Sequence, residues 1–345
     1  MSTSTDEREL LDRARSGDEG AFTELVQAHR GELRAHCYRM LGSVHDADDA
    51  LQDALLRAWR GLPGFQGRGS VRSWLYSIAT NTALDVTRHK CRRELPTTFG
   101  PAAGYGAGEA DAVTEPVWLE PYPDQWLAGG PEARYEQRES LELAFMIMLQ
   151  QLPPLQRAVL ILRDVLGFSP AEMAGQLGTS EAAVNSALQR ARAAARAGLP
   201  ARSQQAELRA LGGQRVSEIA VRYADAIERG DADTLVSMLT EDATWCMPPI
   251  PTWYQGHRVL RDWLVRSPLP ERWRHQATWA NGQPAVGCYL YDGSTGRYSA
   301  AVIDVLTLDR DRIAAVTAFL MPGMPSAGPT GAEIFARFGL PAELP

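Results

Sequence analysis

Apolar residues recur at helical spacing along much of the chain before Gly198. The clearest case is the stretch 46–59, which carries one continuous apolar face made of Ala47, Ala50, Leu51, Ala54, Leu55 and Ala58. This i, i+3, i+4, i+7 spacing predicts a helix whose apolar side is buried. Similar spacing predicts helices within 7–61, over 71–93 and again from Glu136 onward.

Residues 168–196 predict two helices joined by a tight turn. Ser169, Pro170 and Glu172 form a capping box with proline at the first helical position, and Gly178 suits the end of that short helix. Ser180, or Thr179 before it, can cap a second helix that runs to about Arg196. A short helix, a glycine turn and a longer helix are typical of a helix-turn-helix, although an ordinary helical hairpin has the same pattern.

The pattern changes after Arg215. Amphipathic helices are expected over 216–227, 235–239 and 259–264, with Gly230 ending the first. Strand-like runs follow, at 243–247, 273–280, 285–291, 298–308 and 313–321, and Arg310 and Asp311 suit the last hairpin turn. Helices followed by a mostly antiparallel sheet indicate an α+β domain, and a short helix is expected near 334–338.

Two stretches lack any sustained period. Residues 95–134 are rich in Pro, Gly and Ala, which predicts a linker, and 197–214 are expected to be a second linker or a connecting helix. The first linker contains VWLEPYPDQWL, residues 117–127, which is too aromatic to stay in water. We therefore expect this segment to lie against a domain or a partner.

Composition narrows the function class. With 345 residues, 45% hydrophobic residues and a net charge of −7, the chain is a multidomain globular protein that does not coat nucleic acid through a global positive field. Basic residues gather at 88–93 and along 190–202. The four cysteines are scattered, so we expect no disulfide framework, metal site or cofactor. The start lacks a signal pattern and no stretch can span a membrane, so a cytoplasmic location is expected.

Two further helix faces mix residue types. Asp49, Gln52, Asp53, Leu56 and Trp59 combine carboxylates with large apolar groups, which favours either a satellite contact within the domain or a partner surface. The face with Ser73, Ser77, Thr80, Asn81, Leu84 and Arg88 is small and polar and leads into the basic run. Such a face suits close approach to a nucleic-acid strand, or it is simply solvated.

Three motifs in this order resemble the extracytoplasmic-function (ECF) sigma factors, of the SigG-like subgroup: DADDALQDALLRAW, then FQGRGSVRSWLYSIATNTALDVTRHKCRR, then LPPLQRAVLILRDVLGFSPAEMAGQLGTSEAAVNSALQRARA. ADAIERGDADTLVSMLTEDATW resembles SnoaL and NTF2-like domains. The resemblance implies two all-α sigma domains and a C-terminal α+β domain. The expected bounds are 7–94 for sigma region 2, 95–134 for the linker, 135–198 for region 4, 199–214 for a second linker, 215–326 for the SnoaL-like domain and 327–345 for the tail.

The resemblance also implies partners and sites. RNA polymerase core, through its β′ clamp and β flap, and promoter DNA are the implied partners of a chain that is a monomer when free. The implied clamp-binding residues are Asp46, Asp49, Gln52, Asp53, Leu56 and Trp59. The implied minus-ten residues are Phe65, Arg68, Ser70, Ser73, Trp74, Ser77, Asn81 and Arg88; periodicity by itself places Trp74 in the core. The implied minus-thirty-five residues are Ser180, Glu181, Asn185, Ser186, Gln189, Arg190 and Arg192.

The C-terminal domain leaves two functions open. It either regulates the sigma regions, with a possible small ligand in a sheet-lined pocket, or retains catalysis by a general base, for which the candidates are Asp242, His257, His275 and Asp304. A pocket without an ordered acid–base partner would favour regulation. Pocket or core positions are expected for Trp245, Met247, Trp253, Tyr254, Trp279 and Tyr289. For the whole chain, the alternative is a helix-turn-helix regulator with a ligand-sensing or isomerase- or cyclase-like C-terminal domain, which leaves 46–93 without a role.

Overall fold

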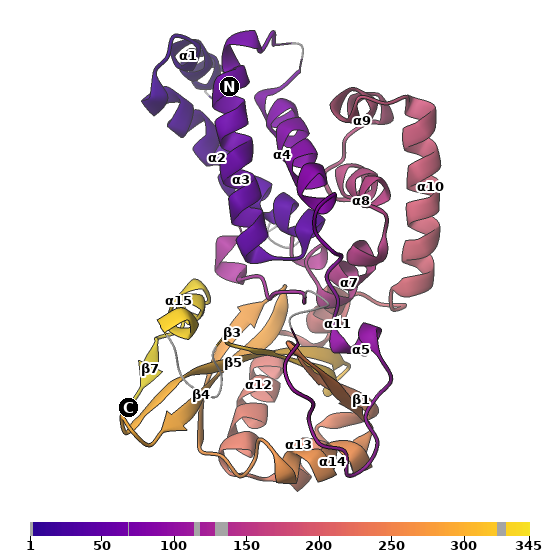
Figure 1. The fold of residues 1–345 in the computed structure, drawn as a ribbon, viewed down its shortest axis with the longest axis vertical. Coiled ribbons are helices and arrows are strands. Elements are labelled where there is room, and N and C mark those ends of the chain that lie inside the picture. The colour runs from indigo at the N-terminus through magenta and orange to yellow at the C-terminus, as the bar shows by residue number, and fades with distance from the viewer. Residues whose placement is uncertain (1–2, 68, 114–117, 128–136, 323–328) are drawn as a thin grey trace. The chain divides into compact units, whose positions relative to one another are not determined.

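The structure is a computed structural model that describes residues 3–67, 69–113, 118–127, 137–322 and 329–345 (Figure 1). The chain divides into two compact units. The first comprises Met1–Arg92, Trp126–Ser140 and Met148–Leu199, and the second Arg93–Gln125, Leu141–Ile147 and Pro200–Pro345. Within the described ranges, no helix is both long and apolar enough to cross a membrane.

The first unit is helical. It begins with α1 (Thr3–Arg15), α2 (Glu19–Leu41), α3 (Val44–Gly61), η1 (Leu62–Gly64) and α4 (Val71–Thr87). Side-chain caps fix three of these starts, because Asp18, Ser43 and Ser70 each accept a bond from a backbone N–H of the first turn. The predicted apolar face of α3 is confirmed, since Ala47, Ala50, Leu51, Ala54 and Ala58 are all buried.

The predicted helix-turn-helix is confirmed. After α7 (Leu143–Gln151), α8 (Pro154–Leu160) and the π-helical turn η3 (Ile161–Val165) come α9 (Pro170–Leu177) and α10 (Glu181–Gly198). Ser169 and Glu172 form the predicted capping box, and Gly178 ends α9 at φ 61°. Met173, Val184 and Leu188 are buried where the two helices meet.

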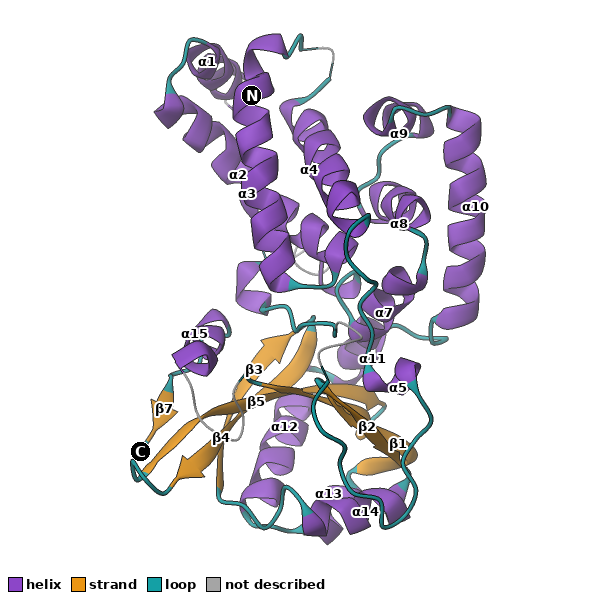
Figure 2. Cartoon of the chain, viewed as in Figure 1, coloured by secondary structure: helices purple, strands orange, loops and turns teal. Residues whose placement is uncertain are grey.

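The second unit contains a sheet with helices packed against it (Figure 2). Its strand order is β2-β1-β6-β5-β4-β3, with β7 pairing to β5. The strands are β1 (Leu239–Met247), β2 (Ile250–Gln255), β3 (Trp273–Ala280), β4 (Gln283–Asp292), β5 (Arg297–Asp309), β6 (Arg312–Leu320) and β7 (Glu343–Leu344). All pairings are antiparallel except β1 with β6, so the α+β prediction is confirmed.

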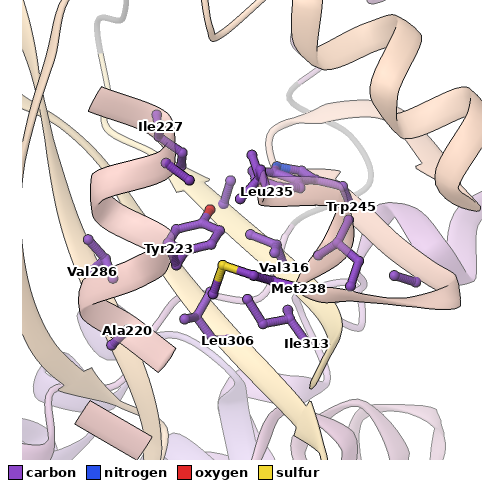
Figure 3. Packing of buried hydrophobic residues seen from close by; sticks show 14 of the residues in the cluster. Ala220, Tyr223, Ile227, Leu235, Met238, Trp245, Val286, Leu306, Ile313 and Val316 are labelled. Carbon is purple, nitrogen blue, oxygen red and sulfur yellow. The ribbon is translucent and has the colours of Figure 1, made fainter. Parts of the chain in front are cut away.

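The helices of this unit are α5 (Pro96–Phe99), α11 (Gln204–Leu211), α12 (Gly213–Glu228), α13 (Ala232–Ser237), α14 (His257–Arg266) and α15 (Pro329–Arg337), and η2 spans Asp124–Trp126. Figure 3 shows Ala220, Tyr223 and Ile227 on the face of α12 that points toward the strands. They pack into one apolar core with residues of the sheet, among them Val286 and Leu306.

Candidate functional site

The face of α3 that mixes carboxylates and apolar groups is only partly exposed. Asp49, Gln52, Asp53 and Leu56 lie at the surface, and Leu56 keeps 55% of its area accessible. Trp59 instead packs against Phe22 of α2, with ring centroids 5.1 Å apart. The helix therefore provides the satellite contact through Trp59 and leaves Leu56 in water among acidic and amide groups.

Asp46, implied by the resemblance as a sixth member of this face, is not at the surface. Only 4% of it is exposed, and its Oδ1 lies 2.5 Å from Lys90 Nζ. A buried carboxylate needs such a partner, because desolvation penalises an unpaired charge. Asp46 thus ties the start of α3 to the basic run after α4.

A cavity of about 490 Å³ lies beside the start of α4 in the first unit. Phe65 and Trp74 form part of its wall, with ring centroids 4.9 Å apart. The placement of Trp74 in the core, predicted from periodicity, is wrong, because its ring is half-buried and faces Phe65. Ser70 caps α4 by accepting from the Ser73 N–H, and Arg68 lies outside the described residues.

The polar face of α4 is covered by α9 within the same unit. Gln176 Nε2 donates to Ser73 Oγ at 3.0 Å. The Gln176 carbonyl accepts from Asn81 Nδ2 at 3.0 Å and from Ser77 Oγ at 3.3 Å. Three of the side chains expected to meet a nucleic-acid strand, those of Ser73, Ser77 and Asn81, are therefore bonded to the helix-turn-helix in this arrangement.

Aromatic packing supports the same contact. Phe168, just before α9, is 6% exposed and meets the ring of Tyr76 edge-on at 5.6 Å. Arg72 lies over the Phe168 ring at 5.7 Å. These groups add apolar burial to the hydrogen bonds of Gln176.

The second helix of the helix-turn-helix presents its polar side outward. Asn185, Ser186, Gln189, Arg190 and Arg192 are all exposed on α10, as predicted. Ser180 caps the helix, and Glu181 begins it. Arg190 donates to Ser186 Oγ at 2.8 Å, whereas Arg192 pairs with Asp164 at 2.5 Å. Arg88, at the end of α4, is exposed beside Asp85.

The aromatic linker segment was expected to lie against a domain or a partner. In its described part, 118–127, Tyr122 and Asp124 lie against the C-terminal domain. Tyr122 N–H donates to Asn281 Oδ1 at 2.8 Å, and Asn281 N–H returns a bond to the Tyr122 carbonyl at 2.9 Å. Gly282 N–H donates to Asp124 Oδ1 at 2.8 Å. Asn281 and Gly282 form the β3–β4 turn, and both have positive φ, so the turn itself holds the linker.

The earlier part of the linker follows β2 and α14 of the same unit (Figures 1 and 2). Ala103 N–H donates to the Trp253 carbonyl at 2.8 Å, and Gly106 N–H donates to Asp262 at 3.0 Å. Glu109 Oε1 accepts from Trp263 Nε1 at 2.7 Å and from Ser267 Oγ at 2.6 Å. The polar groups of the linker therefore find their hydrogen-bond partners in the C-terminal domain, because residues 100–113 form no helix or strand that would pair them.

Glu109 also lines a second cavity, of about 380 Å³, inside the second unit. The walls are mainly apolar and include three indole rings, those of Trp245, Trp263 and Trp273. The remaining lining residues are Ile227, Met247, Ile250, Ser267, Pro268, Glu271, His275, Cys288, Leu290, Val302, Asp304, Ala318 and Leu320. This volume falls at the lower end of the range typical of small-molecule sites.

Two ordered acid–base pairs reach this cavity. Tyr223 OH donates to Asp304 Oδ2 at 2.7 Å, and Cys288 Sγ donates to the same oxygen at 3.2 Å. Burial raises the pKa of Asp304 to about 6. His275 Nδ1 lies 3.3 Å from Glu228 Oε1, but burial dominates and lowers the pKa of His275. A pocket without an ordered acid–base partner would have favoured regulation, but this cavity has two such pairs.

The other catalytic candidates lie elsewhere. Asp242 is exposed on β1, and His257 Nε2 contacts the Leu239 carbonyl at 3.2 Å. Of the six aromatic and methionine positions, Trp245 and Met247 line the cavity. Trp253, Tyr254, Trp279 and Tyr289 are not among the residues that line it. Sequence reasoning missed Glu109, because a linker without period gives no sign of a pocket residue.

Comparisons with known proteins agree with the motifs. The Sigma-70 region 2 family matches residues 25–93, the Sigma-70 region 4 family matches 142–194, and the SnoaL-like domain matches 220–316. The chain is similar to the ECF RNA polymerase sigma factor SigG of Mycobacterium tuberculosis, at 41% identity over 98% of this chain and 87% of the relative. The crystal structure of SigJ from the same organism matches with a TM-score of 0.57 at 22% identity, covering 89% of this chain and 99% of that one.

Proposed function

Because this chain belongs to the family of ECF RNA polymerase sigma factors, we propose that its SnoaL-like domain regulates promoter recognition by holding the linker between the two sigma regions. The chain functions as a sigma factor in transcription initiation. Catalysis of RNA synthesis belongs to the polymerase. What this chain supplies is attachment to the polymerase and to promoter DNA.

For polymerase binding, we propose that Asp49, Gln52, Asp53 and Leu56 contact the β′ clamp, and that region 4 contacts the β flap. An exposed leucine among acidic and amide groups suits a partner surface with an apolar centre and a polar rim. Trp59 and Asp46 support this surface from beneath, through Phe22 and Lys90.

For minus-ten DNA, the proposed site is the cavity beside Phe65 and Trp74 together with the polar face of α4. An unstacked base gains stacking energy on aromatic rings, and small polar side chains allow the strand to approach. For minus-thirty-five DNA, the proposed readers are the exposed polar residues of α10. Linking two weak contacts raises the effective concentration of the second.

The minus-ten face cannot bind DNA while α9 covers it. Gln176 occupies the hydrogen-bonding groups of Ser73, Ser77 and Asn81, so α9 must leave α4 before a strand can take its place. Initiation therefore requires regions 2 and 4 to separate, and the linker between them limits that separation.

The observation that carries the regulatory proposal is the docking of the linker on the C-terminal domain. Backbone and side-chain hydrogen bonds fasten the linker at Ala103, Gly106, Glu109, Tyr122 and Asp124. A fastened linker has a shorter reach than a free chain of the same length. Docking thus restrains the opening of the sigma regions.

Asn281→Gly tests this proposal in the full chain. Glycine accepts the positive φ of 55° at this turn but removes the side-chain bonds of Asn281, including the one accepted from the Tyr122 N–H and the one donated to the Leu141 carbonyl at 2.8 Å. We expect more run-off transcript with core polymerase on a template pool with mapped start sites. Arg310→Gly is the matched control, because Arg310 is an exposed turn residue with φ 53° that makes no hydrogen bond to the described part of the linker.

An unchanged or reduced transcript yield from Asn281→Gly, relative to Arg310→Gly, contradicts an inhibitory linker.

A second candidate function for the C-terminal domain is catalysis, favoured by the His275–Glu228 and Asp304–Tyr223 pairs at the cavity. The test is to incubate a metabolite mixture with each chain and to follow its components by mass spectrometry. A small molecule that the native chain consumes and Asp304→Asn does not would support catalysis.

A further inference from the structure

The polar atoms that the 380 Å³ cavity offers to a ligand are mainly hydrogen-bond acceptors, and the Trp245 Nε1–H is the donor that lacks a hydrogen bond among the described side chains that line it. His275 Nε2 is buried without a hydrogen-bond partner among the described residues, and the His275 side chain is only 1% exposed. With its Nδ1–H directed at Glu228, the neutral ring presents a lone pair at Nε2. Ser267 Oγ–H already donates to Glu109, and Cys288 Sγ–H already donates to Asp304, so neither group is a donor for a ligand.

The charged residues that line the cavity also favour a ligand with hydrogen-bond donors. Three carboxylates, Glu109, Glu271 and Asp304, line the cavity, and among its described lining residues none is Lys or Arg. Three indole rings complete the wall, and indole faces attract cations. An anion would meet like charges with no counter-ion, whereas a cation with N–H groups would satisfy both the charges and the free acceptors.

We propose that this cavity binds an organic cation: a small, mainly apolar molecule that carries a protonated amine. The ammonium group lies among the acceptors of Asp304, His275 and Glu109, and the apolar part packs against the indoles and Val302.

Glu109 connects occupancy of the cavity to the linker, and this part rests on the proposed function. The residue comes from the linker, yet it lines the cavity and is bonded to Trp263 and Ser267 of the domain. A bound ammonium adds a third partner for its carboxylate. The cation therefore fastens residues 100–113 more firmly and strengthens the restraint.

The first test is calorimetric titration of the full chain with three probes of one shape and different charge: 2-naphthylmethylamine, 2-naphthylmethanol and 2-naphthoate. We expect the amine to bind at least about tenfold more tightly than the alcohol, and the carboxylate to bind most weakly. Equal affinities, tightest binding of the carboxylate, or no saturable binding of the amine would overturn the proposal.

Two variants locate the binding. Ala318→Trp fills the cavity and is expected to abolish binding of the amine. Glu109→Gln keeps the side-chain volume. It is expected to weaken the affinity for the amine about tenfold and to leave the affinity for the alcohol unchanged. Asp111→Asn is the matched control, because Asp111 is an exposed linker carboxylate that does not line the cavity. Equal losses for Glu109→Gln and Asp111→Asn would refute a role for Glu109.

Hydrogen exchange then measures the coupling. Saturating 2-naphthylmethylamine should slow amide exchange in 100–113 in the native chain and not in Ala318→Trp. Unchanged exchange with the amine bound overturns the link to the linker. None of these measurements contains polymerase, so their failure leaves the run-off result for Asn281→Gly standing, and a failure of that variant leaves the binding result standing.

Discussion

Phe168→Ala should open the contact between α4 and α9. Phe168 is 6% exposed and loses its contact with Tyr76 and with Arg72 when truncated. Replacing a buried phenylalanine by alanine costs about 3 kcal/mol or more. If that loss falls on the α4–α9 contact, the ratio of open to closed molecules rises more than about 100-fold. Phe168→Leu keeps most of the apolar area, loses only the ring interactions at about 1 kcal/mol, and should raise the ratio about fivefold.

Energy transfer between two dyes in the full chain measures this opening. One dye goes on Cys91, which is exposed, and the other on a cysteine introduced at Ala194, which is exposed on α10. Cys37 and Cys246 will not react, because burial raises the pKa of each thiol to about 12, and burial likewise raises the pKa of Cys288. Phe338→Ala is the matched control, since Phe338 is also 6% exposed but lies in the other unit.

We expect transfer to fall in the order native, Phe168→Leu, Phe168→Ala, and to stay native in Phe338→Ala. Native transfer in Phe168→Ala together with a lowered melting temperature would refute the reasoning, because the lost energy would then lie inside the helix-turn-helix and not between α4 and α9.

Two further predictions concern charge and the polymerase surface. Burial raises the pKa of Asp304 to about 6, so its ionised form destabilises the fold, and this cost develops as pH rises from about 4 to about 6. Asp304→Asn should therefore gain stability relative to the native chain across that window, by at most about 3 kcal/mol in urea unfolding, and a pH-independent difference would contradict the cause given for the shift. Leu56→Arg should weaken binding to core polymerase about tenfold or more while changing stability by less than about 0.5 kcal/mol. Val221→Arg, at a 52% exposed position of α12, is its control, and equal effects of the two would argue against the clamp surface.

Local rules were sufficient for much of the fold. The capping box at Ser169, the glycine at 178 and the apolar face of α3 are set by neighbours within a few residues, and each is found where it was predicted. The strand β2 was missed, because its six residues, Ile250–Gln255, include a proline and become a strand only by pairing with β1. Tertiary pairing of that kind leaves no period in a short segment.

The candidate sites divide in the same way. Exposed positions on α10 follow from helical geometry. Asp46 does not, because its burial depends on Lys90, 44 residues later in the chain. The linker shows the limit most clearly. Its composition predicts no structure of its own, and it becomes ordered because Asn281, Asp262 and Trp263 of the distant domain supply its hydrogen-bond partners. His275 and Asp304 could be named as candidates from residue type, but only the fold brings both to one cavity.

The docked linker has a consequence for the order of events on the ribosome. Tyr122 is synthesised well before its partner Asn281, 159 residues later. At about 5–20 residues per second, the linker waits roughly 8–30 s for the turn that receives it. Both DNA-binding regions are complete before the restraint exists. Each nascent chain therefore passes through an unrestrained period, and a chain whose synthesis stops early never acquires the restraint.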